Sequence, residues 1–171
     1  SQIMSATVFD SEASLSERRV IIRRHGGGVE MVELPWGLQP RENGGRPFTV
    51  TRAEGRTFPS HRCLIPASEF RHRSRGKHYS FSLTSGDWFY FAGIWRPVTQ
   101  DWPEAYAILT TTANDDVAPY HDRQMAVLRR DQRLAWLDLT TREEDLLKPL
   151  PAGAFAVSRL REKSAQATFA I

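Results

Sequence analysis

The sequence predicts an α+β protein that is mostly β: a single domain with a barrel-like, mainly antiparallel sheet core and a few short helices. Runs of β-branched and aromatic residues, bounded by Gly and Pro turns, recur along most of the chain. Helical patterns are confined to two short segments after residue 130. The length of 171 residues suits one domain with a buried core. We expect residues 1–17, which lack periodicity, to form a flexible arm and residues 18–171 to form the domain.

The first predicted element of the domain is a hairpin. Arg18–Arg24 is a β-branched run between arginine pairs, and Gly26–Gly28 supplies the turn. Val29–Leu34 alternates apolar and acidic residues, as a partner strand would. The glycines lack the Lys-Ser/Thr that follows in a phosphate-binding loop, so they indicate a turn and no nucleotide site.

Further strands follow from alternation and from apolar runs. In residues 48–58, Arg52, Glu54 and Arg56 stand at every second position, so a strand there would place them on one face. The other predicted strands are residues 7–9, His61–Ser68, His78–Thr84, Trp88–Trp95, Tyr106–Thr111, Met125–Leu128 and Ala154–Arg159.

Two short helices are predicted near the C-terminus. Residues 131–137 have helical spacing, with Asp131 placed as the N-cap. In residues 141–147, Thr141 and Glu144 stand at capping-box spacing, and Pro149 ends the helix.

Composition excludes several classes of protein. Hydrophobic residues make up 40% and charged residues 25%, as in ordinary globular proteins, and no apolar run is long enough to span a membrane. No secretory leader is recognisable. Cys63 is the single cysteine, which excludes an internal disulfide and disfavours zinc. We expect a cytoplasmic monomer without a metal or cofactor. Because Cys63 lies between core-like residues, we favour a buried, inert thiol over a nucleophile.

Positive charge is concentrated in one part of the chain. Residues 18–77 hold 13 Arg or Lys and 5 Asp or Glu, whereas the rest holds 10 basic and 15 acidic residues. A basic face suits an anion, most economically a nucleic-acid backbone. Within it, residues 69–77 (EFRHRSRGK) are strongly basic, and both phosphate contact and a solvated hairpin explain them.

The segment from Ala107 to Arg123 is the main candidate for a functional site. An apolar strand ends in three threonines, Thr110–Thr112, then turns and returns His121 beside Arg123. Histidine titrates near neutral pH, and arginine matches the geometry of phosphate. These residues alone equally allow a solvent-exposed loop with a structural histidine.

Several motifs, taken together, resemble one family. They are residues 32–38 (VELPWGL), 51–54 (TRAE), 62–68 (RCLIPAS), 91–95 (FAGIW), and 108–114 with 121–123 (ILTTTAN and HDR). In this order they resemble the SOS response-associated peptidase (SRAP) family over roughly residues 20–160. The resemblance implies a β-rich fold around a basic cleft that binds single-stranded DNA with an abasic site. In active members an N-terminal cysteine condenses with the sugar aldehyde and closes a thiazolidine, which crosslinks protein to DNA.

The resemblance also implies roles for particular residues. His121 falls on the catalytic histidine, which handles protons at the sugar ring. Arg52 and Arg123 fall on phosphate-contacting arginines. Trp36 falls on a tryptophan near which a base stacks, and Thr111 lies in the threonine turn that lines the DNA site.

The sequence departs from the family's chemical groups at three places. Val50 stands where the family has an asparagine, and His72 where it has a glutamate; Glu69 is three residues earlier. The sequence shows no Cys-Gly-Arg start. We therefore expect a DNA-binding member of the DNA damage response that has lost covalent crosslinking.

Two alternatives remain. One is an active crosslinking enzyme or peptidase with a substituted nucleophile. Ser1 could form an imine and an oxazolidine, a weaker trap than a thiazolidine, and Cys63 is less favoured still. The other is a non-catalytic module whose cleft binds a repair protein.

Overall fold

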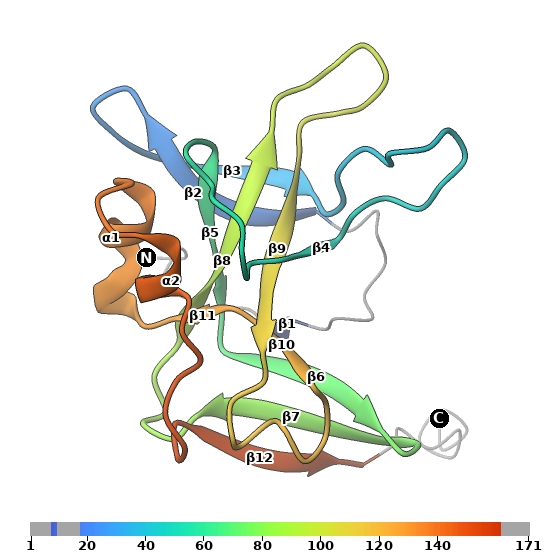
Figure 1. Ribbon diagram of the computed structural model, residues 1–171, viewed down its shortest axis with the longest axis vertical. Helices are drawn as coiled ribbons and strands as arrows, with labels where there is room; N and C mark the ends of the chain where they lie inside the picture. The colour runs from blue at the N-terminus through green and yellow to red at the C-terminus, as the bar shows by residue number, and fades with distance from the viewer. Residues whose placement is uncertain (1–7, 10–17, 162–171) are drawn as a thin grey trace, which may run out of the picture.

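Strand pairing organises the chain into two sheets (Figure 1). The computed structural model describes residues 8–9 and 18–161. The smaller sheet has the order β1 (Val8–Phe9), β6 (Glu69–Ser74), β7 (Lys77–Leu83) and β12 (Phe155–Leu160). The larger sheet has the order β10 (Arg123–Met125), β9 (Ala105–Thr112), β8 (Phe89–Arg96), β5 (Arg62–Ala67), β2 (Arg18–His25) and β3 (Gly28–Pro35). In addition, β4 (Val50–Arg52) pairs with β9, and β11 (Val127–Leu128) pairs with β8.

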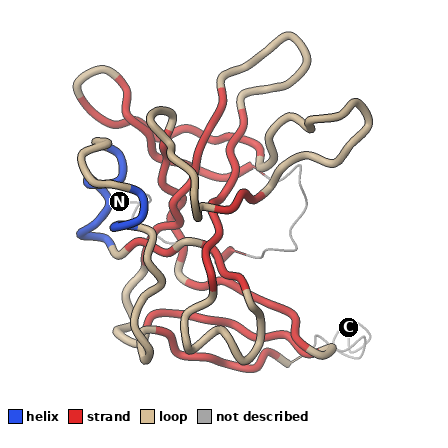
Figure 2. The backbone as a smooth tube through the Cα atoms, viewed as in Figure 1, coloured by secondary structure: helices blue, strands red, loops and turns tan. Residues whose placement is uncertain are grey.

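Most strand pairs are antiparallel. Among the described residues, the β1–β6 and β4–β9 pairs alone are parallel. The helical segments are short: η2 (Arg130–Gln132), α1 (Arg133–Leu137) and α2 (Glu143–Leu146). The predicted class, an α+β domain with a mainly antiparallel core, is therefore confirmed. The large sheet curls around the core as an open path from β10 to β3. Figure 2 shows the long β3–β4 and β8–β9 loops projecting from the same end of this sheet.

The central strands of the large sheet are covered on both faces, which explains their continuous burial. All six residues of β5 are buried. On one face, Ile65 packs in a cluster with Phe70 and Phe81 of the small sheet. On the other face, Leu64 packs in a second cluster with Trp136 of α1. The molecule thus has three layers: small sheet, large sheet and short helices.

A buried arginine connects the helices to the large sheet. Arg62 donates from Nε to the Phe58 carbonyl at 2.8 Å and from Nη1 to the Trp136 carbonyl at 3.0 Å. Its guanidinium lies 4.1 Å from the Trp136 ring centroid, and Nη2 lies 3.5 Å from the Glu143 carboxylate. Because the charge is paired and hydrogen-bonded, it can be buried, and it fixes α1 and α2 against β5.

The predicted strand at residues 48–58 is much shorter in the structure. Only Val50–Arg52 forms a strand, and the chain then turns at Glu54 and Gly55. Gly55 has φ +73°, a conformation that glycine adopts without strain. The expectation that Arg52, Glu54 and Arg56 share a strand face is therefore wrong.

The predicted helix caps also differ from those observed. Asp131 lies within η2, and the N-cap residue of α1 is Gln132. The N-cap residue of α2 is Arg142, so no Thr141 capping box forms. The Glu144 carboxylate instead pairs with the Arg142 side chain.

The predicted arm, residues 1–17, lies outside the described residues except for Val8 and Phe9. These two residues pair in parallel with Glu69 and Phe70, which confirms a short strand there. In the described part of the chain, no helix is both long enough and apolar enough to cross a membrane.

We predict that Gly93→Ala destabilises the domain by about 1–3 kcal/mol. A Cβ at this position in β8 would lie 2.5 Å from Ile65 Cδ1, 2.9 Å from the Ala107 carbonyl oxygen and 3.0 Å from Cys63 Sγ. Urea unfolding measures the effect. Gly27→Ala is the control, because its Cβ would meet no atom within 4 Å. Equal unfolding free energies for the two variants would contradict the packing argument.

Candidate functional site

The end of β9 carries basic side chains on both of its edges. On one edge β4 runs parallel, with Arg52 opposite Thr110. On the other edge β10 runs antiparallel, with Arg123 opposite Thr112. Paired residues on neighbouring strands point to the same face, and every second residue along a strand does too. Arg52, Thr110 and Arg123 therefore share one face, the face whose Ile108 packs toward the small sheet.

Arg123 is held in a bidentate ion pair. Its Nη1 and Nη2 lie 2.9 and 2.8 Å from the two Glu54 carboxylate oxygens, and Nη2 also donates to Thr110 Oγ1 at 3.0 Å. Glu54 further accepts the Thr112 backbone N–H at 2.8 Å. The Arg123 hydrogen bonds are the main cause that lowers the pKa of Glu54 to about 2. A phosphate at Arg123 would thus compete with a carboxylate already in place.

Arg52, on the other edge of β9, is not paired with a carboxylate of any described residue. Its side chain is exposed, and it has no hydrogen bond or ion pair with another described residue. Val50 precedes it by two residues on the same face and is 41% exposed. The face therefore presents a free guanidinium beside the methyl groups of Val50, where the resemblance leads us to expect an asparagine.

His121 closes the turn that follows β9. Asn114 Oδ1 accepts the backbone N–H groups of Asp116 and Val117 at 3.0 and 3.1 Å, and the His121 N–H donates to the Val117 carbonyl at 3.0 Å. The His121 side chain is 42% exposed. Its Nδ1 lies 3.1 Å from the Arg123 nitrogen and 3.0 Å from the Arg123 carbonyl oxygen. Nδ1 thus holds the turn, and Nε2 is the ring nitrogen left for a ligand.

The His121 ring is stacked on His72 of β6. The two ring centroids are 4.6 Å apart and the planes are inclined by 23°. The rings of Phe70 and Phe81 each pack against the His72 ring in a T-shaped arrangement. Burial, with a smaller contribution from His121, lowers the pKa of His72 to about 4, so His72 is neutral at pH 7. A neutral imidazole thus stands where the resemblance leads us to expect a glutamate.

Glu69 does not replace that glutamate. His72 shares its face of β6 with Phe70, toward the core, whereas Glu69 and Arg71 point to the opposite face. There Glu69 accepts from Arg71 Nε at 3.1 Å and also binds the Ser80 hydroxyl. Glu69 therefore lies away from His121, and the carboxylate beside the His121 ring is that of the exposed Asp122, whose Oδ1 lies 3.4 Å from Nδ1.

Trp36 lies in the core. Its side chain is 3% exposed, and Nε1 donates to the Thr49 carbonyl at 2.8 Å. Thr49 immediately precedes β4, so this bond anchors the segment that carries Arg52. The structure thus places Trp36 where it supports the basic face from within, without a ring face open to solvent.

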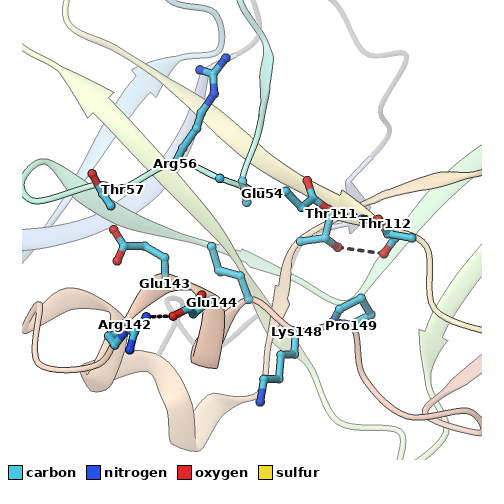
Figure 3. Close-up of a pocket in the computed structure, with 13 residues that line it drawn as sticks. Glu54, Arg56, Thr57, Thr111, Thr112, Arg142, Glu143, Glu144, Lys148 and Pro149 are labelled. Carbon is cyan, nitrogen blue, oxygen red and sulfur yellow. Dashed lines mark hydrogen bonds and ion pairs between the residues drawn. The ribbon is translucent and has the colours of Figure 1, made fainter.

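Thr111 lies on the other face of β9, in a pocket of about 540 Å³ (Figure 3). The side chain is 3% exposed, and Oγ1 donates to the Thr112 carbonyl at 3.2 Å. The charged residues that line the pocket are Glu54, Arg56, Arg142, Glu143, Glu144 and Lys148. Because acids and bases balance, the pocket has no net attraction for an anion, unlike the face with Arg52.

Cys63 is enclosed within the sheet. It is 0% exposed, and burial raises the pKa of its thiol. The thiolate, which is the reactive form, is thus disfavoured, and the prediction of an inert thiol agrees with this placement. No three His, Cys, Asp or Glu side chains in the described part of the chain form a metal-binding group.

The sequence predicted that His121, Arg123 and Arg52 lie in one site, but it did not predict the residues that contact Arg123 and His121. Glu54, expected on a strand face with Arg52, instead binds Arg123. His72, noted only as a departure, stacks on His121. The alternation of Phe70 and His72 on β6 was a signal that His72 points inward.

The fold and the site define a class of protein with a curled, mainly antiparallel sheet and a histidine turn at its edge. Solved structures share this fold. A protein from Bacteroides thetaiotaomicron matches with a TM-score of 0.72 and 18% identity, covering 88% of this chain and 77% of that chain. A Bordetella bronchiseptica protein matches with a TM-score of 0.70 and 20% identity, covering 94% and 93%. A phage-related protein from the same organism matches with a TM-score of 0.66 and 20% identity, covering 86% and 79%.

The family model for SOS response associated peptidase (SRAP) matches residues 12–164. The chain therefore belongs to the SRAP family, as the motifs predicted. No curated protein matched it.

We predict that Glu54→Gln lowers the unfolding free energy at pH 7 by about 0.5–1 kcal/mol, a small value because the carboxylate is half-exposed. Folding lowers the pKa of Glu54 from its ordinary value of 4.5 to about 2. The stabilisation from the ion pair is therefore complete above about pH 4.5 and is lost as the pH falls through about 2. Urea unfolding of wild type and variant at pH 7 and near pH 2 tests this prediction.

The difference between wild type and variant should vanish near pH 2. Glu33→Gln is the control, because Glu33 is an exposed carboxylate on β3. A difference that persisted unchanged at low pH would show that the ion pair is not its source.

Proposed function

We propose that this SRAP protein binds single-stranded DNA, including strands with an abasic site, as part of the response to DNA damage. The observation that supports this most strongly is the exposed Arg52 on the same sheet face as Arg123 and the His121 turn. An unpaired guanidinium and an exposed imidazole on one face suit a phosphate and a sugar. Trp36 and Thr111 support this face from the core and from the opposite side of β9.

We further propose that the covalent step of the family is absent here. The sequence has one cysteine, and Cys63 is enclosed in the sheet. Val50 offers no hydrogen bond in place of the asparagine, and His72 is neutral at pH 7 in place of the glutamate. In this proposal, His121 therefore has neither the asparagine nor the glutamate of the family beside it, and the enclosed Cys63 cannot serve as its nucleophile.

We predict that Arg52→Ala weakens binding to single strands of all sequences, because a phosphate contact carries no base readout. The slope of log K against log salt concentration should fall by about 0.7, the contribution of one phosphate on a single strand. Fluorescence anisotropy at several salt concentrations measures both quantities.

Arg24→Ala is the matched control, because Arg24 lies on β2 and is already paired with Asp138. It removes the same charge and should leave the slope unchanged. An unaltered slope in Arg52→Ala would argue that this face does not bind DNA.

We predict that the protein shifts an abasic single strand in a native gel but leaves no band that survives denaturation. His121→Ala should bind nearly as tightly as wild type, since binding alone does not need proton transfer. A band after denaturation would contradict the loss of chemistry, and mass spectrometry would identify the nucleophile. No native shift at all would favour a module that binds a repair protein.

A further inference from the structure

In the described part of the chain, the end of the small sheet formed by the β6–β7 turn and the last residues of β12 is basic and has no acidic residue. Residues 70–84, which form most of the β6–β7 hairpin, and residues 155–161 of β12 and its end contain six Arg or Lys and no Asp or Glu. At this end, a pocket of about 510 Å³ is lined by Gly76, Lys77, His78, Arg159, Leu160 and Arg161. Its lining has three permanent positive charges and no carboxylate. The pocket therefore has a net attraction for anions.

The cations of this pocket differ from several other surface arginines, which are paired with carboxylates. Arg24, Arg130 and Arg142 are each paired with a carboxylate, of Asp138, Asp87 and Glu144 respectively. Lys77, Arg159 and Arg161 have no such partner among the described residues. Gathering unpaired cations at one place is unfavourable unless an anion binds there.

Strand register connects this pocket to His121. His72 of β6 lies opposite Tyr79 of β7, and Tyr79 lies opposite Arg159 of β12. Cross-strand partners point to the same face, so these side chains form one row on the face that His121 covers. Two steps between neighbouring strands place Arg159 about 10 Å from His72.

Aromatic rings occupy the middle of this row. The ring of Tyr120, the residue before His121, lies 4.4 Å from the ring of Tyr79, measured between centroids. Both residues are only partly buried. Aromatic rings between cations are the arrangement on which single-stranded nucleic acids bind, since bases stack on rings and phosphates meet cations.

We propose that Lys77, Arg159 and Arg161 form a second phosphate-binding site, which holds the backbone of a single strand after it passes His121 and the Tyr79–Tyr120 pair. This inference rests on the proposed function, because the strand must first reach His121. The single-stranded DNA would thus run from the Arg52 face of the large sheet to the basic end of the small sheet.

The test compares strands of three designs by fluorescence anisotropy. One is a short oligonucleotide of about five nucleotides with a central abasic analogue, and the other two extend it by about ten nucleotides on the 5′ or the 3′ side. The variant is Lys77→Ala/Arg159→Ala/Arg161→Ala. The charge-matched control is Arg24→Ala/Arg130→Ala/Arg142→Ala, which removes three cations that are already paired.

The expected result is selective. Wild type binds one extended strand more tightly than the short one, and the pocket variant loses that gain while binding the short strand as before. Its salt slope for the extended strand falls by about 2, the contribution of three phosphates on a single strand. The control keeps the gain. Unchanged affinity for the short strand also shows that the variant is folded; Lys77→Ala alone, at the hairpin end, gives a milder second variant.

Three results would overturn the inference. If pocket variant and control bind every strand alike while wild type binds DNA, the path is wrong and the proposed function stands. If wild type binds none of the strands, the proposed function fails and this inference fails with it. If polyglutamate displaces the extended strand from the pocket as well as unlabelled DNA does, the pocket is a site for an acidic protein.

Discussion

Backbone pairing of β9 on both of its edges is the constraint on which the rest of the site depends. With β4 on one edge and β10 on the other, the register alone decides that Arg52 and Arg123 face the same way. A slip of one residue in either pairing would turn the arginine to the opposite face. The same strand continues into the turn that ends at His121, so one ladder of hydrogen bonds positions all three side chains.

Charge pairing separates residues that the sequence makes look alike. Arg123 and Arg52 lie on the two edges of β9, yet Arg123 is neutralised by Glu54 and Arg52 is not. The ion pair with Glu54 also connects the segment after β4 to β10, so it stabilises the site whose affinity for phosphate it limits. Arg52 on the large sheet and Lys77, Arg159 and Arg161 on the small sheet have no carboxylate partner among the described residues, so in our proposal these cations meet the anion.

Burial explains how the chain can belong to its family and still lack the covalent reaction in our proposal. The ring of His72 packs against Phe70 and Phe81, an environment that keeps the imidazole neutral. A carboxylate there would need a hydrogen-bonding partner to offset its desolvation. The change to histidine thus fits an apolar site beside His121 and agrees with the enclosure of Cys63. Binding through unpaired cations needs none of these groups.

The sequence by itself determined the class of fold, the family, most strands and the candidate residues His121, Arg52 and Arg123, because alternation and colinear motifs are local properties of a chain. It did not determine the turn at Glu54 and Gly55, the ion pair of Glu54 with Arg123, the burial of Trp36 or the stacking of His72 on His121. Each of these depends on which side chains approach one another from distant segments. Only the tertiary structure decided which charges are neutralised and which remain free, and that difference separates a supporting residue from a binding one.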